Sequence, residues 1–304
     1  MLLKLCAKHG RLILVASLVT GLLSKDLARL IEPHIGILIA LLLFTACLRV
    51  GPQQAMGAFA YIGKSLIFTI ILQVALPLLV ALLAKVLGIH NTLVFALVLF
   101  TAAPALSGSP HLVALMGFDP APALRQLVIS TALLPLTVLP VFLFLPELGS
   151  AAVIVSSVVR LLMVIAMAAI AAFTIRMTIL KTLDTGQVEL IDGASTIFMA
   201  IIVVGLMAAI GKEFATNPYN VLTTLAAAIV ANFGLQIVTT IAVSKTGGSP
   251  WTVPIGVIAG NRNVALFLTA LPIDAIQPLL LFIACYQIPM YLTPLVMQRF
   301  YRRF

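Results

Sequence analysis

The chain has very few charged residues. Only 9% of its 304 residues are charged, whereas 62% are apolar; a typical soluble domain has about 25% charged residues. Long polar segments are also lacking, because apolar runs of about 20 residues, the length that crosses a bilayer, follow one another with short polar breaks. No soluble core could hide so much apolar surface. The sequence therefore predicts an all-α polytopic integral membrane protein whose surroundings are the lipid bilayer.

Several function classes lack their characteristic residues. Cys6, Cys47 and Cys285 are isolated, so they form neither a disulfide framework nor a metal-ligand spacing. The sequence has no HExxH or GxSxG motif and no pair of membrane-embedded aspartates, which disfavours a membrane enzyme. The net charge of +9 is not gathered into a basic patch with interleaved aromatic residues, so we expect no nucleic-acid partner. We also expect no cofactor, and the sequence does not specify an oligomeric state.

Hydropathy predicts about ten spans, and their charges predict an orientation. The spans lie at about 11–24, 34–50, 64–87, 92–117, 121–144, 151–179, 194–211, 218–244, 252–272 and 274–298. Ten crossings place both termini on one face, which then receives most of the lysines and arginines, and by the positive-inside rule that face is cytoplasmic. The short loops and the absence of an organelle-targeting segment indicate a bacterial inner membrane.

The fourth predicted span, 92–117, contains residues that interrupt a helix. Pro104 and Pro110 flank Gly108 near its middle. A proline removes an amide donor and collides with the preceding helical turn. We therefore expect this span to unwind into two half-helices, although a simple proline kink is the plainer interpretation of this span by itself.

The ninth predicted span, 252–272, carries a second interruption at membrane depth. Its middle reads Gly260, Asn261, Arg262 and Asn263. Four consecutive polar or flexible residues are costly there unless they line a cavity or bind something. The two interruptions occupy the fourth place in each set of five spans, 1–150 and 151–304, which is typical of inverted-repeat transporters. We therefore expect two inverted five-helix repeats and a carrier function, with an anion channel and a membrane-embedded enzyme as alternatives from other classes.

Three stretches carry a resemblance to a known family. They are QVALP from Gln73 to Pro77, ALSGSP after Pro104, and Gly260, Arg262, Asn263 and Leu266 in the ninth span. Over nearly its whole length the chain resembles the bile acid:sodium symporter family, in particular its bacterial members with ten spans. The resemblance implies a core domain with two crossed discontinuous helices (spans 4 and 9) beside a panel domain, each built from both repeats, with the substrate held between them.

The chain departs from this family where sodium ligands are implied. The positions that usually supply oxygen ligands are occupied here by Ala123, Leu127, Ile258, Arg262 and Pro110. Of the implied ligands only Gln73 and Ser109 are kept. A sodium ion needs several oxygen ligands, so we expect no metal site of the usual kind and a carrier that is not sodium-coupled in the usual family way. A sodium-coupled symporter of an organic acid or a bile-acid-like solute is the alternative.

Arg262 is a permanent charge at the second interruption, and two roles fit it. Its fork of donors can bind a carboxylate, sulfonate or phosphate of a substrate. It can also take the place of the lost sodium ions by bonding carbonyls exposed where the helices unwind. We expect a small organic anion as substrate, bound by residues around the two interruptions: Ser107, Ser109, His111, Asn261, Arg262 and Asn263.

Four further polar residues are candidates for the site: Gln73, Arg125, Asn232 and Gln287. Arg125 lies near the start of the fifth predicted span, so it is expected to reach the membrane interface or to pair with Asp119. Asn232 and Gln287 lie in apolar spans, where hydrogen bonding between helices is the expected use and substrate contact the alternative.

Overall fold

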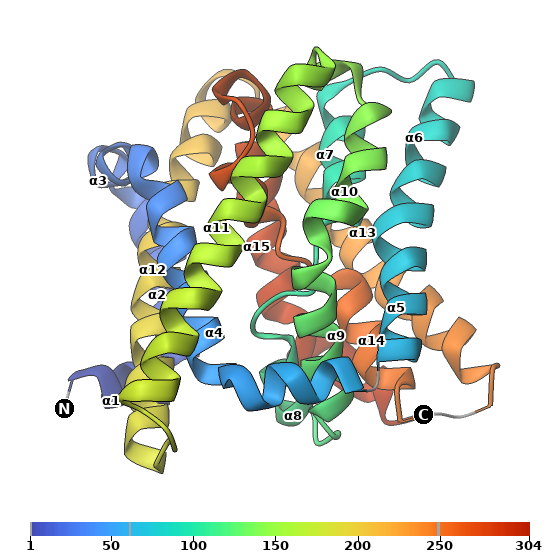
Figure 1. Cartoon of the computed structure of the whole chain (residues 1–304). Helices are drawn as coiled ribbons and strands as arrows, with labels where there is room; N and C mark the ends of the chain where they lie inside the picture. The colour runs from blue at the N-terminus through green and yellow to red at the C-terminus, as the bar shows by residue number, and fades with distance from the viewer. Residues whose placement is uncertain (1, 61, 248–249) are drawn as a thin grey trace.

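The structure is a computed structural model that describes residues 2–60, 62–247 and 250–304. The regular elements in these ranges are helices (Figure 1). In chain order they are α1 (Leu2–Lys8), α2 (Gly10–Leu23), α3 (Lys25–Ile31), η1 (Glu32–His34), α4 (Ile35–Ala60), α5 (Ile62–Ile70), the π-helix η2 (Ile71–Ala75), α6 (Leu76–Val86), α7 (Thr92–Ala102), α8 (Ser109–Leu115), α9 (Ala121–Ala132), α10 (Leu134–Leu143), η3 (Pro146–Leu148), α11 (Ala151–Thr178), α12 (Thr185–Thr216), α13 (Pro218–Ser244), α14 (Thr252–Gly260), η4 (Val264–Thr269) and α15 (Ile273–Tyr301).

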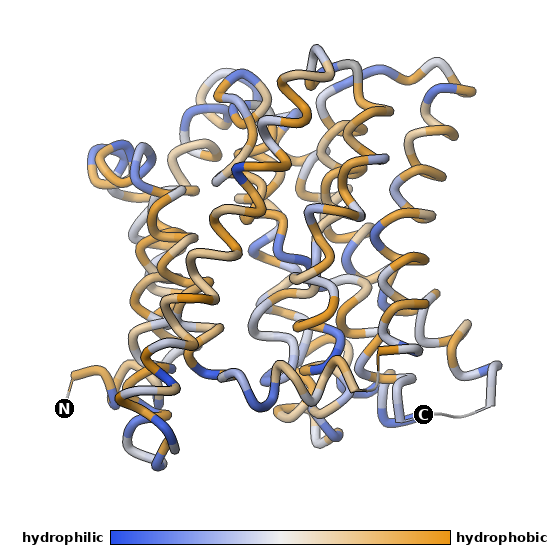
Figure 2. The backbone as a smooth tube through the Cα atoms, viewed as in Figure 1, coloured by the Kyte–Doolittle hydropathy of each residue, from blue (hydrophilic) through white to orange (hydrophobic). Residues whose placement is uncertain are grey.

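Six of the described helices are long and apolar enough to cross a membrane. They are Lys25–Ala60, Ile62–Val86, Ala151–Thr178, Thr185–Thr216, Pro218–Ser244 and Ile273–Tyr301. The pair α9 and α10, bent by 58°, can form a seventh crossing. Figure 2 shows apolar residues along the sides of the bundle and hydrophilic residues mainly at its ends. Side chains such as Leu79, Leu136 and Met167 are exposed on these sides, as expected for helices that face lipid. The chain is an integral membrane protein.

Helix length alone does not reproduce the predicted ten spans. Three predicted spans contain shorter helices: α2 has 14 residues, α7 has 11 and α14 has 9. The last two are short because the chain leaves helical geometry within the predicted span.

Two other helices differ from their predicted bounds. The sequence predicts a span over 194–211, but α12 begins at Thr185, where Asp184 and Gln187 form a capping box. The predicted span 34–50 is followed by Gly51, whose φ of 72° favours glycine. At Gly51 the chain turns, and the rest of α4 runs across the end of the bundle (Figure 1).

The helices form two groups that lie side by side (Figure 1). We call α1–α4, α11 and α12 the panel group, in which α12 packs along α2 and α4 while α11 packs along α4. We call α5–α10 and α13–α15, with η2 and η4, the core group. Both termini lie at the same end of the bundle in Figure 1.

The two interrupted segments cross inside the core group. Ala103 precedes Pro104, and proline pushes the residue before it into extended geometry, so α7 ends at Ala102 and Ala103 has a ψ of 151°. The chain then stays irregular until α8. In the second segment α14 ends at Gly260 and η4 begins at Val264. Both interruptions lie where the sequence places them, except that Pro110 stands in the first turn of α8, a position that tolerates proline, and does not break it.

Candidate functional site

The two interruptions are joined to each other by backbone hydrogen bonds. The Leu106 amide donates to the Asn261 carbonyl at 3.0 Å, and the Asn263 amide donates to the Pro104 carbonyl at 2.9 Å. These two bonds make an antiparallel bridge between Ala105 and Arg262. Buried backbone groups need such partners, because water is absent at membrane depth. We call this arrangement the crossover.

A hydroxyl group from a helix further along the chain supports each strand of the crossover. The Ala105 amide donates to Ser130 Oγ in α9 at 3.2 Å, 25 residues further along the chain. The Arg262 amide donates to the Tyr286 hydroxyl in α15 at 2.6 Å, 24 residues further along. The Tyr286 hydroxyl in turn donates to the Gly260 carbonyl at 2.8 Å. The two halves of the chain thus use the same device at nearly the same spacing.

The guanidinium of Arg262 connects three segments of the core group. Nε donates to the Ala259 carbonyl at 3.0 Å, Nη1 to the Ala103 carbonyl at 3.0 Å and Nη2 to the Leu72 carbonyl at 3.4 Å. Its side chain is 1% exposed, and it is the only buried charged residue in the described part of the chain. Of the two roles expected for Arg262, bonding of the carbonyls left open by unwound helices is the one this geometry displays.

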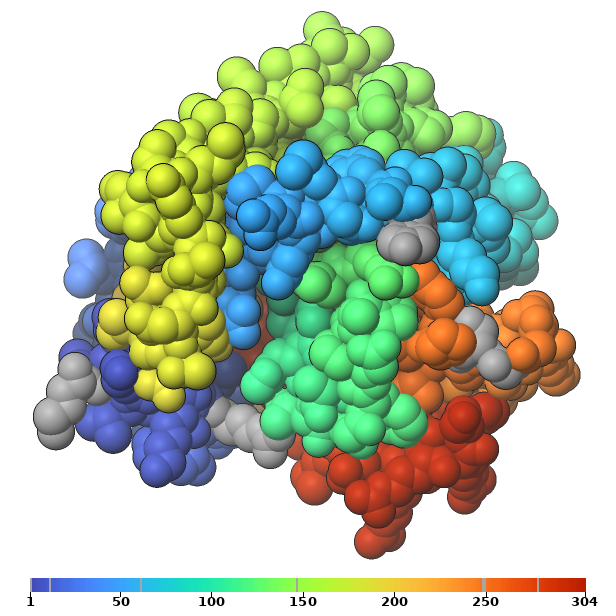
Figure 3. Space-filling model, turned by 60° about the horizontal axis from the view of Figure 1, so that its bottom comes forward, coloured from blue at the N-terminus to red at the C-terminus, as the bar shows by residue number. Residues whose placement is uncertain are grey.

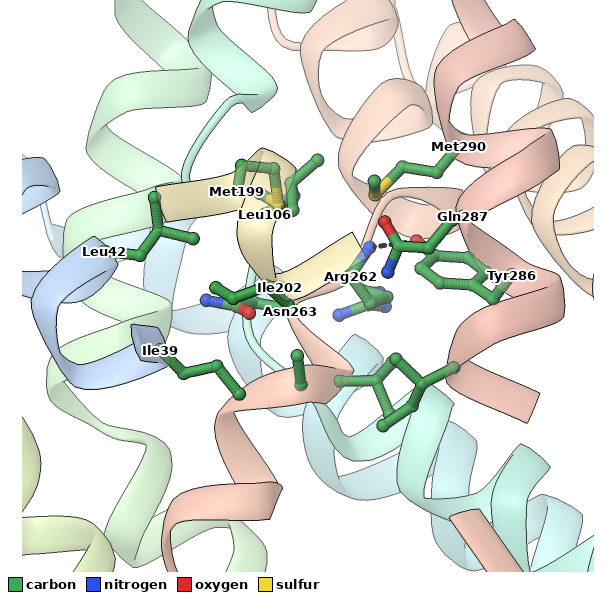
Figure 4. Close-up of a pocket in the computed structure, with 13 residues that line it drawn as sticks. Ile39, Leu42, Leu106, Met199, Ile202, Arg262, Asn263, Tyr286, Gln287 and Met290 are labelled. Carbon is green, nitrogen blue, oxygen red and sulfur yellow. Dashed lines mark hydrogen bonds between the residues drawn. The ribbon is translucent and has the colours of Figure 1, made fainter. Parts of the chain in front are cut away.

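A small cavity lies between the crossover and the panel group (Figure 4). Its volume is about 20 Å³. The panel side is apolar and consists of Ile39 and Leu42 from α4 with Met199 and Ile202 from α12. The core side includes Arg262, Asn263, Tyr286, Gln287 and Met290. The cavity therefore has an apolar panel side and a core side on which the polar groups and the buried charge stand among apolar residues such as Leu106 and Ile283.

Gln287 offers a hydrogen-bonding group to this cavity that the protein does not use. Its side chain is 5% exposed, and its Oε1 accepts no hydrogen bond from the described residues. In Figure 4 the Gln287 amide lies between Met290 and Arg262, on the opposite side of the cavity from Ile39 and Leu42. A buried acceptor without a partner is unfavourable, so this amide can accept from a water or, turned over, donate its NH2 group to a bound acceptor.

No family model and no curated protein matches this chain. The geometry of the site is therefore the basis for assigning its function.

Asn261 and Asn232 belong to a network of buried polar side chains on the far side of the crossover. Asn232 Nδ2 donates to the Gly260 carbonyl at 2.6 Å, and the Asn261 amide group bonds the Val257 carbonyl and the Thr293 hydroxyl. Gln236 extends the network by donating to the Asn232 and Thr293 side chains. These groups hold α13, α14 and α15 together, which is the helix-to-helix use expected for Asn232.

The other expected substrate ligands do not line the cavity. Ser107 and Gly108 lie in the turn before α8, and Ser109 is the first residue of that helix. Ser109 is fully buried and its Oγ has no partner among the described residues. His111 is exposed on α8. α8 packs against α9 and α14, away from the panel group that forms the apolar wall.

Gln73 and Arg125 also lie outside the cavity lining. Gln73 is buried in η2 and its Nε2 donates to the Ser130 carbonyl at 3.3 Å, so it braces the helix that supports the first strand of the crossover. Arg125 is half-buried in α9.

Three of the positions implied as sodium ligands come together without an oxygen ligand, whereas the two kept ligands, Gln73 and Ser109, each have a buried oxygen with no partner among the described residues. Ala123, Leu127 and Ile258 pack in one apolar cluster with Val113 and Val257. Ala123 and Ile258 are at most 1% exposed. Their side chains supply no lone pair that could replace a hydration shell, so these residues do not fit a sodium ion.

Sequence reasoning missed Tyr286, Ser130 and Leu72. Tyr286 stands directly before Gln287 in an apolar span, where a buried tyrosine needs a partner for its hydroxyl. The common spacing of Ser130 and Tyr286 from the two interruptions was a signal in the sequence. Leu72 acts through its backbone carbonyl, which no side-chain pattern reveals.

Proposed function

We propose that this chain is a secondary-active transporter that moves a small organic anion by alternating access. The observation that carries the proposal is the cavity at the crossover, placed between two groups of helices. Substrate sites of inverted-repeat carriers form where discontinuous helices meet near the bilayer midplane. A site between two helix groups can be opened to either face by movement of one group against the other.

We count α2 and the two interrupted segments as crossings, in addition to the six long helices and the bent pair. These ten crossings form inverted repeats over 1–150 and 151–304. The matched hydroxyl supports, Ser130 for Ala105 and Tyr286 for Arg262, favour this division. We further propose that both termini lie on the cytoplasmic face of a bacterial inner membrane, as the distribution of basic residues indicates.

The walls of the cavity favour an amphipathic anion as cargo. Arg262 has five N–H donors, of which the described carbonyls take three, and neutral carbonyls leave its positive charge uncompensated. Asn263 and Gln287 add neutral hydrogen-bonding groups on the same wall. The facing apolar wall suits a hydrocarbon body. A carboxylate, sulfonate or phosphate on a small apolar skeleton satisfies both walls.

The cavity is closed in this conformation. A volume of about 20 Å³ accommodates one water molecule and no organic solute. Binding therefore requires the panel and core groups to separate around Arg262. On the face that carries both termini, Figure 3 shows a recess between α4, α12 and the α8–α9 region, and this recess is the proposed approach to the interface.

Paired probes test the nature of the cargo. The purified chain is screened by thermal shift against phenylacetate and cyclohexanecarboxylate, each compared with its neutral amide. We expect the acids to raise the melting temperature and the amides to have little effect, because only the acids pair with Arg262. In Asn263→Ala, which keeps the guanidinium, the acids should bind more weakly, while Arg160→Gln, a change at an exposed position of α11, should leave binding unchanged. Equal effects of acids and amides would contradict an anionic cargo.

Transport is then measured in proteoliposomes with the acid that binds best. A carrier shows saturable uptake that is accelerated by unlabelled substrate on the other side. Flux that does not saturate would indicate a channel, and conversion of the labelled acid to a new compound would indicate an enzyme. Either result would refute the proposed function.

A further inference from the structure

We propose that the guanidinium of Arg262 is a built-in cation that holds the crossover together, so that no sodium ion is bound there and transport is not driven by a sodium gradient. The structural part of this inference concerns the crossover alone, and its consequence for coupling rests on the proposed function.

The Leu72 carbonyl is free to accept from Arg262 because of a local change in helix type. In η2 the Leu76 amide bonds the Ile71 carbonyl, five residues back, and not the Leu72 carbonyl. The next residue, Pro77, has no amide hydrogen. The Leu72 carbonyl therefore lacks a helical donor, and Nη2 of Arg262 supplies one at 3.4 Å.

The other two carbonyls are left open by the interruptions themselves. Ala103 lies beyond the last residue of α7, so its carbonyl has no helical donor. The Ala259 carbonyl would receive the Asn263 amide if α14 continued, but that amide donates to the Pro104 carbonyl. Arg262 bonds both carbonyls at 3.0 Å. One side chain thus satisfies the acceptors opened by three separate departures from α-helical geometry.

The electrostatics of this place favour a cation. α7 and α14 both end at the crossover, so the negative ends of two helix dipoles point toward it. Open carbonyls and helix C-termini are also the groups that coordinate cations in broken-helix carriers. A guanidinium meets the same requirement, with the difference that it is covalently attached.

Covalent attachment has an energetic consequence. A gradient can drive transport only if its ion binds differently in different states of the carrier, since coupling is a difference in binding free energy. Arg262 is neither released nor exchanged, and the residues in place of the implied sodium ligands, such as Ala123 and Ile258, are apolar. The crossover therefore remains assembled throughout the cycle at any sodium concentration.

Melting temperatures test the inference without a substrate. The wild-type chain is compared in sodium chloride and in choline chloride at equal ionic strength, and we expect equal melting temperatures. Arg262→Ala should melt at a lower temperature, and low concentrations of guanidinium chloride should restore part of the loss. Urea, an uncharged molecule of similar shape, should not restore it, and guanidinium should not stabilise the wild-type chain or Arg160→Gln.

A higher melting temperature of the wild-type chain in sodium would overturn the inference, and so would an Arg262→Ala protein that melts like the wild type. If Arg262→Ala does not fold, two other measurements test the inference: the comparison of the wild-type chain in sodium and choline, and the melting temperature of Arg262→Lys. The lysine variant keeps the charge but cannot bond three carbonyls in a plane. It should therefore fold but melt at a lower temperature than the wild type.

A flux measurement tests the consequence for coupling. Proteoliposomes are loaded with choline, placed in sodium buffer with the membrane potential clamped at zero, and supplied with the best-binding acid. An uncoupled carrier brings the internal acid concentration to the external value and no higher. Accumulation above it would overturn the inference. Because the melting experiment needs no acid, failure of the chain to transport anything would refute the proposed function alone.

Discussion

The two interruptions of the core group use the same backbone device but differ in what they carry. Between α7 and α8 the chain consists of small or apolar residues with no charge, and Ser130 supports it. Between α14 and η4 it carries Arg262, and Tyr286 supports it. The charged side chain of the second interruption reaches back to Ala103 in the first. The first interruption thus contributes only its backbone, whereas the second contributes its backbone and the guanidinium to which carbonyls of both interruptions are bonded.

A second contrast lies within three consecutive residues. Asn261 is fully buried and its amide is used by Val257 and Thr293, on the side of α13 and α15. Asn263 is half-buried and lines the cavity beside Gln287. Residues two apart share a face only while the backbone stays extended, and Asn263, with φ −88° and ψ 62°, departs from that geometry, so one asparagine serves the fold and the other faces the site.

Substitution of a glycine in each interruption is expected to give the largest difference in stability between the two. A Cβ at Gly260 would lie 2.1 Å from the Asn232 carbonyl oxygen and 2.5 Å from Gln236 Cγ, so Gly260→Ala forces α13 and α14 apart. We expect a loss of about 3 kcal/mol or more in unfolding free energy. At Gly108 the nearest atom would be Leu106 Cδ2 at 3.9 Å, and φ is −82°, so Gly108→Ala should be tolerated. Melting temperatures of the two variants in detergent measure the difference, and equal losses would contradict the asymmetry.

Removal of the two supporting hydroxyl groups should give a smaller difference in unfolding free energy. Tyr286→Phe leaves the buried Arg262 amide without its acceptor and removes one of the two donors to the Gly260 carbonyl, which keeps only Asn232. We expect a loss of about 1 to 3 kcal/mol. Ser130→Ala removes only the acceptor of the Ala105 amide, because the Ser130 hydroxyl otherwise donates to a carbonyl of its own helix. Its loss should be near the lower end of that range. A more stable Tyr286→Phe than Ser130→Ala would show that the second interruption does not depend on its tyrosine.

The smallest effect on stability is expected at the cavity wall. Gln287→Leu removes a buried oxygen that has no partner, so the unfolding free energy should change by less than about 1 kcal/mol. The same change also removes the amide NH2 group, which can donate to a carboxylate, so it should weaken binding of phenylacetate or of whichever acid binds best. Asn232→Leu provides the contrast, because it removes one of the two donors to the Gly260 carbonyl and the acceptor of the Gln236 amide, and it should lower the melting temperature clearly. If the glutamine change destabilised the chain as much as the asparagine change, Gln287 would be part of the fold and not of the site.

Particular residues show how far sequence reasoning reached. Pro104 and the run from Gly260 to Asn263 located both interruptions, because a missing amide donor and polar residues at membrane depth have few structural outcomes. The same reasoning placed His111 and Ser107 at the substrate, whereas the structure places them on α8 and in its preceding turn, outside the cavity lining. Closeness to an interruption in sequence does not place a side chain in the cavity lining, because packing decides which side of α8 faces the panel group.

Composition, hydropathy and helix-breaking residues by themselves determined an all-helical membrane protein with two interrupted segments, since these follow from local chemistry and the cost of burying backbone polar groups in lipid. Only the tertiary structure decided that Arg262 bonds Leu72, Ala103 and Ala259, that Asn263 faces the cavity while Asn261 does not, and that Gln287 lies there without a partner. The physical reason is that an open carbonyl becomes a binding site only through what packs against it, and the three carbonyls come from segments far apart in the sequence.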